Sequence, residues 1–184
     1  MWYSYAHWRA HVSPTEIGLC SHGSKPWRGH LHLSGVDHIL NDAWMQWRKP
    51  TLLVNFVDLR SYASEPPHVE QIRRMQKTQK FRCMDLVMSN LHHRLKAVET
   101  FTSIARHLDA DEEHHVIFFC KNGKDRSAFG ILAFLQTIYR YSFEEAMLEL
   151  RFRPAKAGLW PLVHLRDIPK IWWDWLESVV SEAQ

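Results

Sequence analysis

The strongest hydrophobic pattern of the chain lies in its second half. Residues 116–119 are four apolar residues in succession, which is typical of a short strand buried on both faces. Polar residues follow from Lys121 to Ser127, and residues 128–135 are then apolar on nearly every side of a helix. The pattern therefore predicts a buried strand that passes through a tight loop directly into a buried helix.

Earlier apolar runs predict the rest of a sheet. Residues 30–33 alternate between polar and apolar, and residues 52–57 form an apolar run. Residues 81–88 form a further strand-like run that contains Asp85. Between the first two runs a helix is expected to start near Ser34, with an acidic residue as its capping partner. Its predicted apolar face consists of Val36, Ile39, Leu40, Ala43, Trp44 and Trp47.

Three more helices are predicted around the central pattern. Ser89 is expected to cap the first, which runs to Leu108. Ser142 and Glu145 have the spacing of a capping box for the second, which a break at residues 151–154 should end. Pro169 is expected to open the third, whose apolar residues should pack on the sheet; a membrane anchor is the alternative. The face that the first helix is predicted to bury consists of Leu91, Leu95, Val98, Thr102 and Ala105.

The length and composition predict one domain. With 184 residues, of which 46% are hydrophobic, the chain is long enough to bury a substantial core. Residues 1–27 are aromatic and polar without a clear period, and we interpret them as an N-terminal extension packed on a single domain of residues 1–184; a substrate-binding lid is the alternative. Strands that alternate with helices place the chain in the α/β class, with a central, mostly parallel sheet flanked by helices.

Charge and cysteine content restrict the possible functions. A net charge of +3 is compatible with phosphorylated small molecules or an anionic membrane surface, but it is too small to indicate nucleic-acid binding. Three scattered cysteines, Cys20, Cys83 and Cys120, do not form a disulfide framework or a zinc site, which favours a reducing compartment. No apolar run of membrane-spanning length and no signal peptide are found.

Histidines give no clear indication of a metal. His30 and His32 are expected on one face of a strand, but the neighbouring sequence offers no third ligand, so neither a metal nor a cofactor is expected. The pairs at residues 92–93 and 114–115 are interpreted as solvated.

The loop after the predicted central strand contains a cysteine, five residues, and then an arginine followed by a hydroxyl residue. Such a loop can point successive backbone N–H groups at an anion, and the start of the following helix adds its positive end. Arg126 supplies a planar fork that matches two phosphate oxygens, and Gly123 allows the backbone angle that a tight turn requires. The spacing therefore predicts a phosphate-binding loop.

Cys120 is the predicted nucleophile. Near the loop amides and Arg126, its thiol is expected to lose its proton well below the pKa of ~8.5 of a free cysteine, and the thiolate is the reactive form. Ser127 can donate a hydrogen bond to the thiolate or assist its departure from a phosphocysteine. The predicted phosphate- and substrate-binding residues are Lys121, Asn122, Gly123, Lys124 and Ser127.

At these residues the sequence resembles the cysteine-dependent phosphatases of the protein tyrosine and dual-specificity superfamily. Lysines at the first and fourth positions between Cys120 and Arg126 resemble the lipid 3-phosphatase related to tensin. The Asp-Arg pair followed by a hydroxyl residue is similar to myotubularins, Sac-type phosphatases, inositol polyphosphate 4-phosphatases and bacterial effector phosphatases. Two positions depart from the common pattern, because Phe119 replaces a histidine and Ala128 a glycine. The loop is most similar to the inositol-lipid and inositol-phosphate branches.

This resemblance extends from about residue 28 onward and implies a dual-specificity-phosphatase-like fold. It also implies phosphomonoester hydrolysis through a phosphocysteine intermediate, without a metal. A short strand that ends in Asp58-Leu59-Arg60 is similar to a triplet of the superfamily, in which Asp58 and Arg60 are interpreted as a strand-end ion pair rather than as catalytic residues. The loop at Lys156, Gly158 and Trp160 corresponds to one that often reaches the active-site mouth.

The general acid has two candidates. Asp85 lies 35 positions before Cys120, close to the usual distance of the superfamily's mobile acid loop, but its surroundings contain no proline or glycine. Asp125 lies inside the loop beside Arg126, as in the Asp-Arg branches, and is the favoured candidate.

Phosphoinositides or soluble inositol phosphates are the expected substrates, because Lys121 and Lys124 add two charges where a polyanionic ring would lie. A protein tyrosine or dual-specificity phosphatase, and a catalytically weak phosphate-binding pseudophosphatase, are the alternatives. The expected location is the cytoplasm, either of the protein's own cell or of a host cell if it is a secreted effector, with peripheral membrane contact as a further expectation.

Overall fold

The computed structural model describes residues 17–19, 27–57, 82–156 and 168–182, with the single positions 70, 74, 77 and 165, and at 17–19 and 151–156 it describes the backbone only. The predictions for Asp58 and Arg60, for the loop at Gly158 and Trp160 and for most of the N-terminal extension lie outside the described residues. Within the described part of the chain, no helix is long and apolar enough to cross a membrane.

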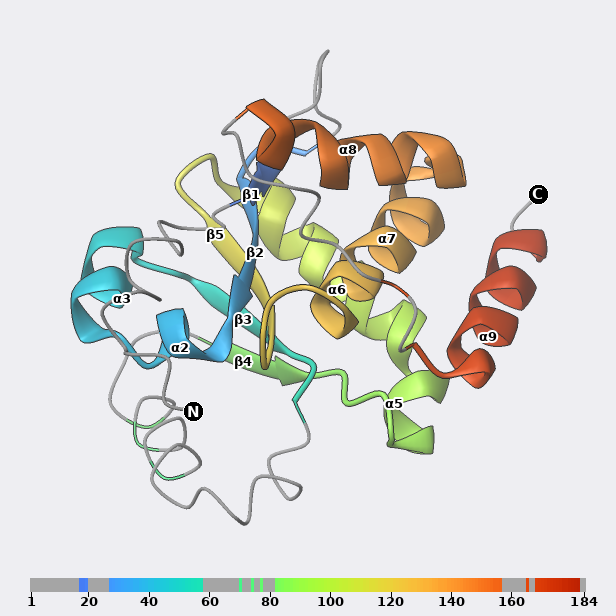
Figure 1. Ribbon diagram of the computed structural model, residues 1–184, viewed down its shortest axis with the longest axis horizontal. Coiled ribbons are helices and arrows are strands. Elements are labelled where there is room, and N and C mark those ends of the chain that lie inside the picture. Colours follow the sequence, from blue (N-terminus) through green and yellow to red (C-terminus); the bar gives the residue numbers. More distant parts are fainter. Residues whose placement is uncertain are drawn as a thin grey trace, which may run out of the picture.

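Five strands form one sheet in the order β1-β2-β5-β3-β4 (Figure 1). β1 runs antiparallel to β2, and the other neighbours are parallel. The prediction of a mostly parallel sheet is therefore confirmed. The strands are β1 (Ile17–Leu19), β2 (His30–Gly35), β3 (Leu52–Asn55), β4 (Arg82–Asp85) and β5 (His115–Cys120).

Helices cover both sides of this sheet. Figure 1 shows α3 on one side and α6 to α9 on the other. Residues 116–119 of β5 are fully buried, as expected for a parallel strand covered on both faces. The helices are α2 (Val36–Ile39), α3 (Asp42–Arg48), α5 (Leu91–Leu95), α6 (Ala97–Ala110), α7 (Arg126–Tyr139), α8 (Phe143–Lys156) and α9 (Lys170–Ser181).

The predicted strand, loop and helix around residue 120 are present as β5 and α7. α7 is buried from Ser127 to Thr137, because it lies between the sheet and the helices α6, α8 and α9. The ring of Phe56 lies against this helix so closely that a Cβ on Gly130 would be 2.1 Å from its Cζ atom. A glycine in mid-helix thus allows the chain after β3 to pack tightly on α7.

The helix predicted after Ser34 is instead two short helices, α2 and α3. Gly35 is the N-cap of α2 and no side chain caps it, whereas the Asn41 side chain accepts a hydrogen bond from Trp44 N and starts α3 anew. This second start changes the direction of the apolar face. Met45 is therefore buried and Trp47 is exposed, so the predicted face was wrong at these positions.

The helix predicted from Ser89 to Leu108 is also divided. Asn90, rather than Ser89, caps α5, and the helix is interrupted at Lys96 before α6 begins. The face that enters the core consists of Ala97, Phe101, Ile104, Ala105 and Leu108. Leu91, Leu95 and Val98 are exposed, so the prediction that these three residues face the core was wrong. The core-facing residues recur with the helical period once counting starts at Ala97.

The C-terminal helices are largely as predicted. Ser142 N donates to Glu145 Oε2 at 2.7 Å and Glu145 N donates to Ser142 Oγ at 3.1 Å, which is the predicted capping box. α8 continues to Lys156, so the predicted break at residues 151–154 was wrong. α9 follows Pro169 as predicted, but it buries Trp172 and Leu176 against α7, which lies between it and the sheet, so the prediction that it packs on the sheet was wrong.

Of the four histidines that were expected in solvent, His92 is exposed, whereas His93, His114 and His115 are partly buried. Because β2 and β5 are parallel neighbours in register, His115 lies beside His30, with ring centroids 4.6 Å apart, and its Nδ1 lies 3.0 Å from Nε2 of His32. Burial, together with His30 and Arg48, lowers the pKa of His115 to about 4. His114 likewise stacks on His107 at 4.1 Å. Among the described residues, no three histidine, cysteine or acidic side chains are arranged to hold a metal ion.

Candidate active site

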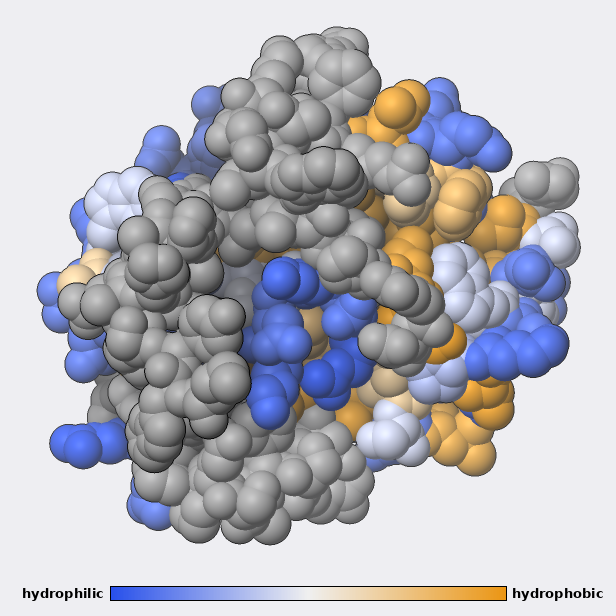
Figure 2. Space-filling view, in the orientation of Figure 1, coloured by the Kyte–Doolittle hydropathy of each residue, from blue (hydrophilic) through white to orange (hydrophobic). Residues whose placement is uncertain are grey.

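The candidate site is the phosphate loop, residues 120–127, at the carboxyl end of β5 (Figure 1). Cys120 is the last residue of the strand and Arg126 is the first residue of α7, so the strand and the helix fix the two ends of the loop. Figure 2 shows hydrophilic side chains at the centre of the view, where Figure 1 shows this loop. The candidate site thus lies at the carboxyl ends of the strands, where α/β folds commonly bind ligands.

The backbone of the phosphate loop rests on the turn between β2 and α2. Gly123 has a φ of 66°, in the left-handed region that favours glycine. A Cβ at this position would lie 2.7 Å from the backbone carbon of Ser34 and 2.8 Å from Gly35 N. On the same side of the loop, Val36 N donates to the carbonyl of Lys121 at 3.2 Å. Both the backbone angle and the close approach therefore require glycine here, as the sequence predicted.

Cys120 has the surroundings of an activated thiol. Its side chain is buried, and the fully buried Ser127 hydroxyl donates to Sγ at 3.1 Å. Burial is the largest single influence and would raise the pKa of Cys120. The Ser127 hydroxyl, the backbone amides of Ser127 and Gly123 and the Arg126 charge outweigh it, so the pKa lies below its ordinary value. The loop therefore favours the thiolate.

Basic side chains outnumber acidic ones in the phosphate loop. Arg126 and Lys124 are half-buried, whereas Lys121 and Asn122 are exposed. Asp125 is the only acidic residue between Cys120 and Ser127, so the loop carries an excess of positive charge. Together with the positive end of α7, these side chains suit a phosphate dianion, and the exposed lysine can meet further phosphates of the same ligand.

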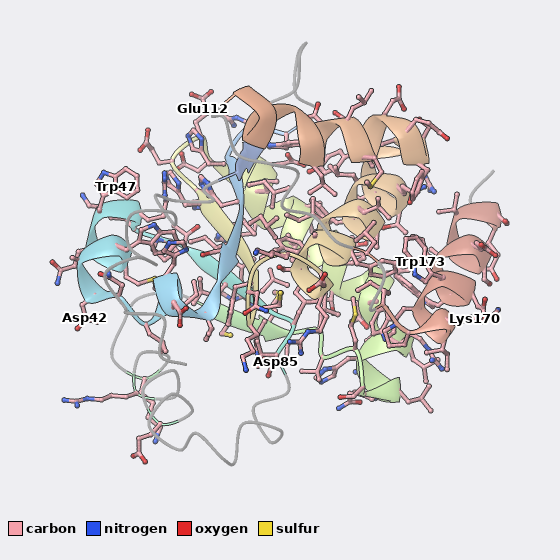
Figure 3. The ribbon with its side chains drawn as sticks, in the orientation of Figure 1. Asp42, Trp47, Asp85, Glu112, Lys170 and Trp173 are labelled. Carbon is pink, nitrogen blue, oxygen red and sulfur yellow. The ribbon has the colours of Figure 1, made fainter. Side chains whose placement is uncertain are left out.

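The two candidate acids lie in different places. Asp125 is the N-cap residue of α7, half-buried, and its backbone carbonyl accepts from Phe129 N at 2.8 Å. Asp85, labelled in Figure 3, is exposed at the carboxyl end of β4. The pairing of Asp85 with Asn55, and of Asn55 with Phe119, places Asp85 two strands away from the nucleophile. Strand spacing makes this separation about 10 Å between backbones.

A residue that the sequence interpretation missed fixes Asp85. The buried Asn55 side chain donates to Asp85 Oδ1 at 2.9 Å and to the carbonyl of Val57 at 3.1 Å, and it accepts from Val57 N at 2.9 Å. The signal was present in the sequence, because Asn55 is a polar residue within the apolar run 52–57. A buried side-chain amide must form hydrogen bonds. Here these bonds fix the backbone at the end of β3 and hold the carboxylate of Asp85 on β4.

Comparisons with known proteins show the fold but no close relative. No protein-family model matches the chain, and no curated protein matches it. Among solved structures, the human tyrosine phosphatase-like serine/threonine/tyrosine-interacting protein superposes with a TM-score of 0.57 at 14% identity, over 83% of this chain and 92% of that one.

Two phosphatases from other organisms have similar structures. The PTP-2 phosphatase of Cydia pomonella has a TM-score of 0.55 at 13% identity, over 80% of this chain and 84% of its own. The Yvh1 phosphatase domain of Chaetomium thermophilum has a TM-score of 0.54 at 16% identity, over 83% of this chain and 91% of its own. The chain therefore has the α/β fold of dual-specificity and tyrosine phosphatases, as the resemblance of its loop implied.

Proposed function

We propose that the chain is a cysteine-dependent phosphomonoesterase that acts on phosphoinositides or inositol phosphates. The observation that carries the proposal is the buried Cys120 thiol, whose pKa is lowered and which receives a hydrogen bond from Ser127 within a loop folded around Gly123. A surface turn with an incidental cysteine needs none of these features. The superposition with phosphatases supports the same class of fold.

The proposed reaction has two steps. The Cys120 thiolate attacks phosphorus, the bond from phosphorus to the leaving oxygen breaks, and an aspartate gives that oxygen a proton. Arg126 and the loop N–H groups bind the three remaining phosphoryl oxygens and stabilise their charge in the transition state. Water then attacks the phosphocysteine, the phosphorus–sulfur bond breaks, and inorganic phosphate leaves with the thiolate restored; Ser127 supports the departing thiolate through its hydrogen bond.

The structure bears differently on the two candidate acids. The sequence argument against Asp85 was that its strand-like surroundings contain no proline or glycine to make a mobile loop. Asp85 does lie in a strand, but it is exposed and is the last residue of β4. Asp125 lies inside the phosphate loop, but it is also the N-cap residue of α7. Both aspartates therefore stay candidates, and a leaving-group test that separates them is given in the Discussion.

The substrate class rests on charge. Lys121 is exposed at the loop and Lys124 is half-buried. In addition to Arg126, these two cations can bind other phosphates on an inositol ring. A tyrosine or dual-specificity protein phosphatase is the enzymatic alternative, since solved structures of that class share this fold.

Phosphate release is the direct test. The protein should release inorganic phosphate from at least one member of a panel of phosphoinositides, inositol phosphates and phosphopeptides. Cys120→Ser should lower the rate of that release by a factor on the order of 10⁴ or more. Preference for phosphopeptides would replace the proposed substrate class with the protein phosphatase.

A binding protein without catalysis is the second candidate. It is favoured by one solved structure of this fold, whose name describes a phosphatase-like interacting protein. If the wild-type protein binds inositol phosphates tightly but releases phosphate from no substrate, this candidate is correct and the enzyme proposal is wrong.

A further inference from the structure

An apolar surface on α5 and the start of α6 has no partner in the core. The exposed fractions are 58% for Leu91, 72% for Leu95 and 39% for Val98. Leu91 and Leu95 are four residues apart on α5 and so share one face of that helix, and Val98 follows directly after the interruption at Lys96. Single exposed leucines are common on soluble proteins, but here three exposed apolar side chains occur within one short segment. We call these three residues the α5 stripe.

Basic side chains accompany the α5 stripe. The sequence from Leu86 to Val98 contains no aspartate or glutamate, whereas Arg94 and Lys96 lie between the apolar positions. Lys96 and His92 are exposed and Arg94 is half-buried. Apolar residues combined with lysine and arginine are the composition of segments that lie in the interface of an anionic bilayer. Acidic water-soluble ligands would match the charges but not the leucines.

The α5 stripe lies at the same end of the sheet as the phosphate loop. α5 starts six residues after Asp85, the carboxyl end of β4, and β4 runs parallel to β3 and β5. Figure 1 shows α5 at the end of the sheet where β5 enters the phosphate loop. In Figure 2, hydrophobic side chains at the lower right lie on the same visible face as the hydrophilic centre.

Hydrogen bonds fix this segment to the domain. Val87 N donates to His93 Nδ1 at 3.0 Å, and Trp172 Nε1 of α9 donates to the carbonyl of Met88 at 2.5 Å. The tryptophan that donates the second bond is itself buried. The apolar side chains are therefore presented in a fixed direction relative to the sheet, and not by a freely moving tail.

We propose that the α5 stripe is a membrane-docking surface that holds the phosphate loop against an anionic lipid bilayer. This inference rests on the proposed function and deepens it, because it selects lipid-bound phosphoinositides over soluble inositol phosphates as the substrate. The leucines enter the boundary between head groups and acyl chains, while Arg94 and Lys96 meet lipid phosphates. The apolar contact of the leucines and the electrostatic contact of the basic residues are each weak alone. Together they can give membrane binding that is stable but reversible.

Vesicle binding of the full chain tests the docking surface. The wild-type protein should co-sediment with phosphatidylcholine vesicles that contain phosphatidylserine or a phosphoinositide, and less with pure phosphatidylcholine. The double variant Leu91→Ala/Leu95→Ala should bind the anionic vesicles about ten-fold more weakly, because it removes methyl and methylene groups that the bilayer would bury. Leu148→Ala is the matched control, since Leu148 is 51% exposed on α8, away from the site, and its loss should leave binding unchanged.

Activity on two forms of one lipid separates docking from chemistry. The double variant should hydrolyse a dispersed short-chain phosphoinositide as fast as the wild type, but the same head group in vesicles more slowly. Equal vesicle binding by the wild type and the double variant would overturn the proposed docking surface. The proposal would also be wrong if the two leucines were needed to bind a phosphopeptide but not to bind vesicles. Leucine-dependent vesicle binding without hydrolysis of any substrate supports the docking surface and refutes the proposed enzyme.

Discussion

The phosphate loop and the segment from β4 to α5 lie at the same edge of the sheet but are held in place differently. The loop is enclosed: Gly123 touches the backbone of Ser34, and Ser127 reaches Cys120 within seven residues. The β4–α5 segment is open to solvent, and its contacts come from distant parts of the chain, through Asn55 and Trp172. We therefore expect the first region to hold an anion and the second to present side chains to the ligand that approaches the loop.

This difference separates the expected roles of the two regions. Donors fixed in advance around a developing charge contribute most to catalysis, which describes the phosphate loop. We expect the exposed side chains of the β4–α5 segment instead to select the ligand that reaches that loop and to take part in the proposed reaction. Variants that remove the thiol or the donors around it should therefore slow the proposed reaction on every substrate. Variants of the candidate acids, of the loop lysines or of the open region should slow it on some substrates more than on others.

The largest expected effect concerns the general acid. Asp125→Asn and Asp85→Asn should each be assayed on an inositol phosphate and on nitrophenyl phosphate. Loss of the true acid should slow inositol phosphate cleavage by ~10²–10⁴ while sparing the nitrophenyl ester, because nitrophenolate leaves without a proton. If only Asp125→Asn spares the nitrophenyl ester in this way, the general acid lies in the phosphate loop. If only Asp85→Asn does so, the general acid lies at the end of β4, in the open region.

Both variants also have an informative failure. If Asp125→Asn damages the two substrates equally, Asp125 serves to hold the start of α7. If neither variant distinguishes the substrates, the assignment of the acid to these two aspartates is wrong. Asn55→Ala sharpens the comparison, since removing the amide that holds Asp85 should mimic Asp85→Asn only if Asp85 is the acid.

The second effect compares the two sides of the α5–α6 segment. Phe101 is fully buried and its ring lies 5.6 Å from that of Phe134, so Phe101→Ala should lower the free energy of unfolding by about 3–5 kcal/mol. Leu95→Ala should change it by less than about 0.5 kcal/mol, because that side chain is exposed. Urea denaturation of both variants measures the difference. A large loss in Leu95→Ala would mean that Leu95 packs in the core and that the α5 stripe is not a surface.

The sequence predicted the phosphate loop well because the pattern that identifies it is local, although the loop also packs on the distant residues Ser34 and Val36. The apolar run, the glycine and the apolar helix follow one another within 20 residues, so each supports the interpretation of the next. The buried strand, the left-handed Gly123 and the hydrogen bond from Ser127 to Cys120 are all present. The assignment of catalytic roles to these residues stays a prediction.

The open region was harder to predict because its structure depends on distant residues. A helical period that includes Leu91, Leu95 and Val98 fits the sequence, but a cap at Asn90 and the break at Lys96 shift the buried face to another set of residues. The partner of Asp85 lies 30 positions away and that of Met88 lies 84 positions away. Spacing within one segment contains no information about such contacts.

The third effect concerns the lysines of the loop. Lys121→Ala and Lys124→Ala should weaken hydrolysis of multiply phosphorylated inositols more than that of a single aryl phosphate. The expected difference is about 1–3 kcal/mol in transition-state stabilisation for each well-formed charged contact. Values of kcat/KM on both substrates give this difference. Equal losses on the two substrates would contradict the inositol assignment, and Lys170→Ala on α9 is a control for loss of an exposed lysine elsewhere.

The smallest effect concerns the hydrogen bond inside the enclosed region. Ser127→Ala removes the hydroxyl that donates to Cys120 Sγ at 3.1 Å, and so it should raise the pKa of the Cys120 thiol. Because the pKa of the thiol is lowered, wild-type alkylation should fall only as the pH falls through that lowered value. In Ser127→Ala the fall should begin at higher pH, and alkylation below that point should be about ten-fold slower than in the wild type.

A matched control separates this electrostatic effect from the loss of a hydroxyl in general. Ser103→Ala on α6 removes a hydroxyl that donates to the carbonyl of Glu99 at 3.1 Å, and the pH profile of alkylation should not change. If Ser127→Ala leaves the profile unchanged as well, Ser127 is not what holds the thiolate. Arg126 and the loop amides would then account for the lowered pKa, and the enclosed region would be less dependent on any single side chain than its geometry indicates.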